Sequence, residues 1–445
     1  MSTKRAQRLL AAPILPTIAR LAAPGVLLAL FQTAVSIADT HYVGRLGTEA
    51  LAGLALVFPL VMLLQMTSAG AMGGGVSSAL ARALGAGNEA AARRLVTHAL
   101  VIALCAGLLF TLLLLALGEV LYALLGGKGE ALAQALAYSH VLFAGAVFVW
   151  LANTLASVLR GSGNTLTPAI ALAAAATVQI PLSGALTLGW WSFPRLGITG
   201  AALAYVVAFL VASLIMGAAV WRGALRPRHA DWQFEARHFR DILRVGALSS
   251  LGALQTVLTA VILTGFVGSF GTAALAGYGV GVRLELLQVP LVFAIGQALV
   301  VLVGTNIGAG QGARAKRIAW AGTAIAIGIS LAIGLFVAVY PAAWIHIFSD
   351  DPAVLETGSL YLRIVAPFYA LFGAGMALYF SSQGAGRMLL PVLAGTVRLV
   401  LVVAGGTAVV ALAGPLAAIF AVVAGGMVLF GGLITTTVYR ARWGT

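Results

Sequence analysis

Two carboxylates stand inside otherwise apolar stretches of this chain, and they are its best candidates for chemistry. Asp39 follows 21–38, a run without a charged residue that is long enough to cross a bilayer as a helix. Glu285 lies within the stretch GYGVGVRLELLQVP. The other ten acids fall in predicted loops or near helix ends. An acid inside a membrane is costly to bury, so both residues indicate an ion-binding site or a buried ion pair.

Asp39 continues a polar stripe on its predicted helix. Ser36 and Gln32 lie three and seven residues earlier, on the same helical face. Gln179, in the segment AATVQIPLSG, adds a polar group in the fifth apolar run. We predict that Asp39, Gln32, Ser36 and Gln179 bind a proton or a small cation. One titrating acid is enough for protons, which we favour, whereas sodium needs several oxygen ligands and stays open. The alternative is an interfacial acid solvated by water and lipid headgroups.

Two basic residues are candidate partners of Glu285. Arg283 is only two residues away and points to another face of the helix, so the two do not form an ordinary helix-face pair. Arg398, in the eleventh apolar run, is a candidate partner. Two interpretations stay open, a functional second proton or ion-pair site and a static ion pair that only packs helices.

The elements that carry these residues are membrane helices. The chain has 445 residues, of which 61% are hydrophobic and only 9% charged, whereas soluble domains carry about 25% charged residues. We therefore predict an all-α polytopic membrane protein with twelve transmembrane helices and both termini on one side. The expected spans are 16–41, 49–78, 93–117, 132–159, 165–188, 197–221, 241–266, 273–304, 316–340, 356–382, 388–411 and 414–438.

The basic residues are distributed unevenly between the predicted loops. The net charge is +14, but the loops on the side away from the termini hold only Arg45, Lys128 and Arg195. Most of the other lysines and arginines, from Lys4 to Arg442, fall on the side of the termini. This asymmetry follows the positive-inside rule and predicts cytoplasmic termini, with the basic residues facing anionic lipid rather than nucleic acid.

The chain repeats itself with an offset of about 223 residues. VGRLGTEALAG at 43–53 matches VGSFGTAALAG at 267–277, and GAGNEAAARR at 85–94 matches GAGQGARAKR at 308–317. GSGNTLTP at 161–168 matches GAGRMLLP at 384–391. We expect two six-helix lobes of the same orientation, 1–221 and 241–445, with a central cleft between them. The link 222–240 is expected to be a cytoplasmic hinge, and its aromatic residues suggest an interfacial helix.

The repeat also shows that Asp39 has no counterpart. Gln32 and Ser36 correspond to Gln255 and Thr259, but Asp39 corresponds to Ile262 or, at an offset of 224, to Leu263. A residue required only by the scaffold would more naturally occur in both copies. The asymmetry favours a coupling role for the acid in the N-terminal lobe.

These motifs together resemble the multidrug and toxic compound extrusion (MATE) family. The resemblance rests on ADTHYVGRLG at the end of the first helix, GAGN and GAGQ after the second and eighth, and RGSGNTLTP after the fourth. It implies an antiporter of the bacterial inner membrane that exports organic cations or other toxic amphiphiles in exchange for protons or sodium. It also implies that Asp39 is the family's ion-binding acid. The fifth helix departs from the family, since Ala176 and Ile180 stand where many members carry Asn and Asp.

Flexible and aromatic side chains are candidates for lining a substrate cavity, although such residues also pack in any helix bundle. The candidates are Phe58, Met62, Met66, Gln255, Thr259 and Tyr278, together with Phe148 and Trp150. No phosphate-binding loop or metal motif occurs, so we expect no cofactor and no enzymatic activity. The expected partners are small-molecule substrates, H+ or Na+ and lipid, for a monomeric protein. The alternatives are a lipid-linked oligosaccharide flippase and, less well supported, a membrane enzyme.

Overall fold

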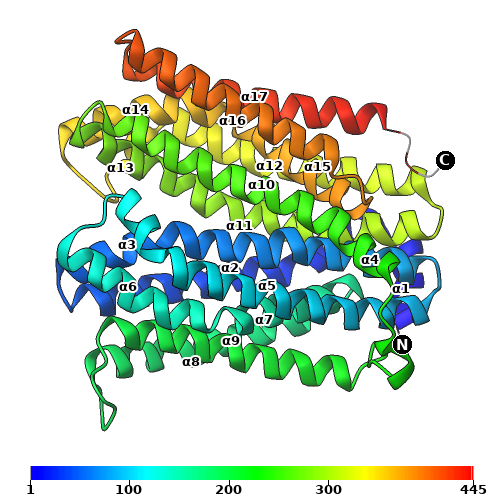
Figure 1. The fold of residues 1–445 in the computed structure, drawn as a ribbon. Helices are drawn as coiled ribbons and strands as arrows, with labels where there is room; N and C mark the ends of the chain where they lie inside the picture. The colour runs from blue at the N-terminus through cyan, green and yellow to red at the C-terminus, as the bar shows by residue number, and fades with distance from the viewer. Residues whose placement is uncertain (1, 442, 444–445) are drawn as a thin grey trace.

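The protein is a bundle of long helices that run roughly parallel to one axis (Figure 1). The structure, a computed structural model, describes residues 2–441 and 443, so Arg442 lies outside the described residues. The N-terminal half contains α1 (Ser2–Ala11), α2 (Ile14–Gly44), α3 (Thr48–Gln65), the π-helix Met66–Met72, α4 (Gly73–Gly85), α5 (Glu89–Leu124), α6 (Gly129–Ala144), α7 (Ala146–Gly161), α8 (Leu166–Leu188) and α9 (Ile198–Trp221). The C-terminal half contains α10 (Ala236–Gly268), α11 (Thr272–Gly308), α12 (Gly312–Val339), α13 (Pro341–Ile345), α14 (Pro352–Val365), α15 (Tyr369–Gly384), α16 (Leu389–Ala411) and α17 (Leu416–Arg440).

The prediction of twelve spans is confirmed. Within the described residues, eleven continuous helical stretches are long and apolar enough to cross a membrane. The twelfth span is the pair α6 and α7, which is bent by 50°. The bend falls at Gly145, whose N–H bonds to the carbonyl of Leu142 and so leaves the α-helical pattern.

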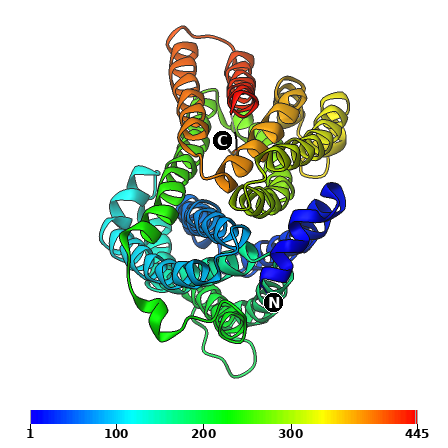
Figure 2. The same ribbon diagram turned by 90° about the vertical axis from the view of Figure 1, so that its right-hand side faces the viewer.

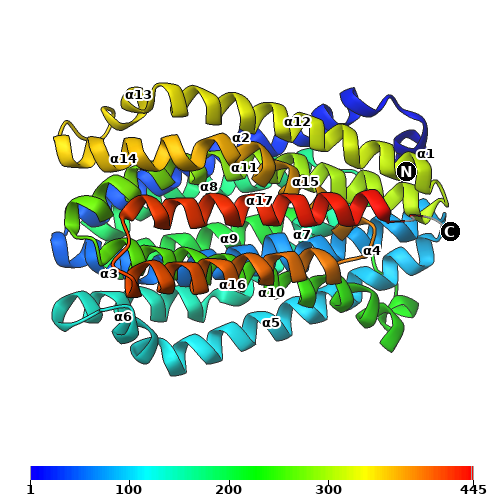
Figure 3. The same ribbon diagram turned by 90° about the horizontal axis from the view of Figure 1, so that it is seen from above.

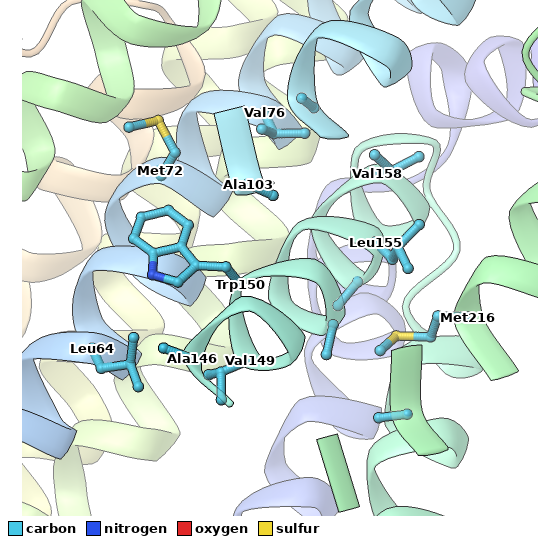
Figure 4. Packing of buried hydrophobic residues seen from close by; sticks show 14 of the residues in the cluster. Leu64, Met72, Val76, Ala103, Ala146, Val149, Trp150, Leu155, Val158 and Met216 are labelled. Atoms are coloured by element: carbon cyan, nitrogen blue, oxygen red, sulfur yellow. The ribbon is translucent and has the colours of Figure 1, made fainter. Parts of the chain in front are cut away.

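The helices form two lobes with equivalent internal packing (Figures 1 and 2). In the N-terminal lobe α2 packs on α8, α3 on α6 and α8 on α9. In the C-terminal lobe the corresponding pairs are α10 with α16, α11 with α14 and α16 with α17. The duplicated architecture inferred from the repeats is therefore present in three dimensions. Figure 4 shows part of the N-terminal core, where Leu64, Met72 and Trp150 are buried.

Both termini lie at one end of the bundle, which we call the terminal end (Figure 3). Helix α1 bridges the two lobes there. Ala6 is buried in the hydrophobic core of the N-terminal lobe, whereas Leu9 is buried with residues of the C-terminal lobe. The Arg314 side chain also donates a hydrogen bond to the carbonyl of Ala12.

The lobes meet closely in the half of the bundle nearer the terminal end. Ser78 Oγ donates to the Gln383 carbonyl at 2.6 Å, and Gln383 Nε2 donates to the Gly70 carbonyl at 3.1 Å. A Cβ atom placed on Gly308 would lie only 2.0 Å from the Arg82 carbonyl oxygen. Among the described residues, every hydrogen bond between the lobes lies in this half. The structure is therefore closed at the terminal end.

The linker between the lobes differs from the expected interfacial helix. Residues 222–240 contain a 3-10 turn, His229–Trp232, and the beginning of α10 from Ala236, with no separate helix before it, because Gly223 and Pro227 interrupt helix formation. Asp231, expected near water, is buried and pairs with Arg93, with 3.3 Å between Nε and Oδ2. Thr97 Oγ1 donates to the Asp231 carbonyl at 2.9 Å. The linker is thus fastened to α5 of the N-terminal lobe.

Candidate ion-coupling site

Asp39 on α2 receives two hydrogen bonds from α8. Gln179 Nε2 lies 2.9 Å from Oδ2, and Ser183 Oγ lies 2.6 Å from Oδ1. Each carboxylate oxygen therefore accepts one neutral donor. A carboxylate has about four acceptor positions, so positions remain for a proton or a metal cation.

The sequence of α8 explains how both donors reach the same acid. Gln179 and Ser183 are four residues apart and lie on one face of the helix. Both side chains are buried, with exposed fractions of 4% and 0%. Pro181 lies between them and is tolerated inside α8, although it cannot donate the usual backbone hydrogen bond. Gln179 was the predicted neighbour of Asp39, and Ser183 is a second neighbour that was not predicted. Its spacing of four residues from Gln179 places it on the same helical face and could have identified it.

The other two members of the predicted stripe lie apart from this hydrogen-bonded group. Gln32 and Ser36 are on α2 and are exposed, whereas Asp39 is half-buried. Within the described residues, neither side chain bonds to Asp39, and no lysine or arginine forms an ion pair with it. The negative charge is therefore balanced only by neutral donors in this structure.

The equivalent place in the C-terminal lobe is apolar. At the offset of 223 residues, Gln179 corresponds to Val402 and Ser183 to Gly406. The ring of Phe266 occupies the space beside Gly406, where an added Cβ atom would lie 2.3 Å from Cε2. The only side-chain hydrogen bond described between α10 and α16 joins Gln255 Nε2 to Thr396 Oγ1 at 2.8 Å. The carboxylate site therefore belongs to one lobe.

A second polar network lies in the same lobe as Asp39. Gln65 Nε2 lies 2.5 Å from Tyr205 Oη, and Asn153 Nδ2 donates to Gln65 Oε1 at 3.0 Å and to Ser68 Oγ at 2.8 Å. Ser68 belongs to the π-helix Met66–Met72, a type of distortion that is frequent at functional sites. The network joins α9, α3 and α7. No periodicity in the sequence brings these segments together.

Glu285 lies on α11 inside the C-terminal lobe. The hydroxyl of Tyr361, on α14, donates to Oε1 of Glu285. Tyr361 packs edge-on against Tyr278 and Phe420, with ring centroids 5.3 Å and 5.1 Å away. The acid therefore contacts one tyrosine of an aromatic cluster that is drawn from α11, α14 and α17.

The two candidate basic partners of Glu285 have other neighbours. Arg283 lies over the ring of Phe348, with Cζ 5.1 Å from the centroid. Arg398 lies against Phe372 and Phe430, at 5.3 Å and 5.8 Å. The described residues contain no direct ion pair from either arginine to Glu285.

The residues predicted to line a cavity have different surroundings. Phe58 is exposed, while Met62, Met66 and Phe148 are partly exposed. Thr259, Tyr278 and Trp150 are buried. Thr259 Oγ1 donates to the carbonyl of Gln255 at 2.7 Å within α10, and Gln255 Nε2 donates to Thr396 Oγ1 of α16 at 2.8 Å.

Comparison with known proteins places the chain in a family. The MatE family model matches residues 24–184 and 250–427, which lie in the two lobes. The chain is 29% identical over 373 residues to an FAD transporter of Shewanella oneidensis, covering 82% of this chain and 81% of that protein. It is 26% identical to a probable multidrug resistance protein NorM of Thermotoga maritima, covering 78% and 75%.

The fold agrees with a solved transporter structure. A MOP superfamily transporter from Pyrococcus furiosus superposes with a TM-score of 0.89 at 25% identity, covering 97% of this chain and 96% of that one. The match extends over both lobes. Together with the family model, these observations show that the chain belongs to the MATE family of membrane transporters and is not an enzyme.

Proposed function

We propose that the chain is a secondary active exporter that exchanges an organic substrate for protons, with sodium as the alternative ion. The observation that carries the proposal is the half-buried Asp39 carboxylate, held by Gln179 and Ser183 without a basic partner among the described residues. An ion that binds this carboxylate changes its charge and its hydrogen bonding. Such a change can shift the equilibrium between two arrangements of the lobes.

The contacts between the lobes support an alternating-access mechanism. Ser78, Arg82 and Gln383 bond across the lobe interface in the half nearer the terminal end. Opening the molecule at that end requires these contacts to break. We infer that this closed form alternates with one that is open at the terminal end, by rocking of the lobes.

The arrangement of charge supports a cytoplasmic position for the terminal end. The linker arginines lie there, and only Arg45, Lys128 and Arg195 lie in connections at the opposite end. By the positive-inside rule, both termini face the cytoplasm of a bacterial inner membrane. The structure then corresponds to the form that is closed to the cytoplasm.

The substrate class follows from the relatives. The NorM relative supports export of multiple toxic compounds, for which amphipathic organic cations are the first class to test. The Shewanella relative makes an anionic flavin nucleotide the second candidate. The flippase alternative has less support, because Arg283 and Arg398 pack against separate aromatic groups and do not form one cationic surface.

Transport by the purified protein in liposomes tests the proposal. A pH or sodium gradient is imposed, and uptake of a fluorescent organic cation or of FAD is followed. We expect gradient-driven flux that Asp39→Asn abolishes, while Thr396→Val, which removes the side-chain hydrogen bond between α10 and α16 of the other lobe, keeps it. Flux that does not depend on either gradient contradicts the antiporter mechanism. Full flux in Asp39→Asn contradicts the assigned site.

A further inference from the structure

A cavity of about 420 Å³ lies at the terminal end, away from the candidate ion-coupling site. It forms where α9 ends and the linker begins, and its volume falls within the range of small-ligand pockets. The lining residues are Trp221, Arg226, Pro227, Arg228, His229 and Trp232. Figure 2 shows the linker at the edge of the N-terminal lobe, away from the contact between the lobes.

The charge of this cavity is positive and is not balanced by the nearby acids. Asp231 pairs with Arg93, and Glu235 pairs with Arg94 and Arg237. Among the described ion pairs, none uses Arg226 or Arg228, and both arginines are exposed. Guanidinium groups bind phosphate oxygens with paired hydrogen bonds. The cavity therefore fits an anion that carries a phosphate.

The wall of the cavity is held in place. The backbone N–H of Arg228 donates to Asp231 Oδ2 at 2.8 Å, and the N–H of Glu235 donates to His98 Nε2 at 3.0 Å. The first bond lies within the linker and shapes the turn. The second fastens the linker to α5, together with the pairing of Asp231 and Arg93. A ligand therefore meets a largely formed site and loses less free energy in ordering it.

The position of the cavity indicates where its ligand comes from. Trp221 is the last residue of α9, an apolar span, so it lies at the edge of the membrane. The Trp221 and Trp232 side chains are 42% and 44% exposed. Exposed tryptophan is typical of the headgroup level of a bilayer, where its ring packs beside lipid while its N–H stays near water.

We propose that this cavity binds the phosphodiester headgroup of an anionic phospholipid. Arg226 and Arg228 contact the phosphate oxygens, and the two tryptophans pack against the adjoining glycerol and chains. The site requires only the membrane position of the chain and is independent of the transported substrate. Its effect is to tie the linker of the N-terminal lobe to the bilayer surface.

Native mass spectrometry of the full-length protein tests this site. The protein in detergent is titrated with phosphatidylglycerol and, separately, with phosphatidylcholine. We expect phosphatidylglycerol to bind more tightly, and R226Q/R228Q to weaken it about thirtyfold, since each arginine contributes about fivefold. The matched control R222Q/R240Q removes two exposed arginines that do not line the cavity, so it should change the affinity less than about threefold.

Three results would overturn the proposal. Equally weakened binding of phosphatidylglycerol in the two double variants would mean that net charge alone determines the affinity. Equal binding of the two lipids would remove the anionic headgroup as the ligand. Displacement of the lipid by millimolar inorganic phosphate would identify a site for free phosphate. If the double variant unfolds, the single variants R226Q and R228Q are compared with R222Q, and the loss expected of each is about fivefold.

Discussion

Ser183 Oγ lies 2.6 Å from Asp39 Oδ1 and donates a hydrogen bond that links α8 to α2. A donor of this kind stabilises the ionised carboxylate, so it competes with an arriving ion. The contact therefore connects the occupancy of Asp39 with the packing of two helices.

The variant Ser183→Ala separates the two possible coupling ions. If protons are coupled, as we expect, loss of the donor favours the protonated acid and lowers the half-saturating proton concentration about tenfold. Sodium would instead bind more weakly, because the hydroxyl oxygen is a possible ligand. The measurement is flux into liposomes as a function of the concentration of each ion. Thr396→Val is the control, and an unchanged ion dependence in Ser183→Ala would contradict a role for this hydroxyl.

Removal of the buried linker acid should destabilise the protein. Asp231→Ala leaves Arg93 without its partner and the Arg228 N–H without its acceptor. We expect the free energy of unfolding to fall by about 3 kcal/mol, measured by denaturant titration in detergent. Asp350→Ala removes an exposed acid that pairs with His346, so a loss below about 1 kcal/mol is expected. Equal losses in the two variants would show that the linker is not anchored as described.

The close contact at Gly308 should control closure of the terminal end. In Gly308→Ala the new methyl group collides with the Arg82 carbonyl, so the lobes must separate there. Spin labels on either side of the interface should then report a larger population of long distances. Gly279→Ala is a control on the same helix, because its Cβ atom meets nothing within 4 Å. A distribution identical to that of the control would contradict the prediction.

Helix α1 should stabilise the same closed form. Leu9 is buried with the C-terminal lobe, whereas Gln7 on the same helix is exposed. Leu9→Asp removes apolar burial worth about 2 kcal/mol, so the ratio of open to closed molecules at this end should rise up to about thirtyfold. The same distance measurement checks it, and Gln7→Asp should have no effect. If the two variants behave alike, α1 does not fasten the lobes.

The candidate site was only partly predictable from the sequence. Asp39 could be selected because acids are rare inside membrane spans, and Gln179 because it is the only amide side chain in the fifth span. The pairing of Ser183 with Asp39 depends on how α8 is rotated against α2, which helical periodicity leaves undetermined. The same limit applies to Tyr361, which donates to Glu285 and was not among its predicted partners.

The sequence by itself determined the membrane helices, their duplication and the single lobe that carries Asp39. Apolar length, repeated motifs and charge distribution are properties of the chain that need no contacts between distant segments. Only the tertiary structure decided which donors reach Asp39, that Asp231 is buried and that the lobes are closed at the terminal end. These features depend on the rotation and close approach of helices far apart in the chain, where one glycine such as Gly308 sets the distance between two backbones.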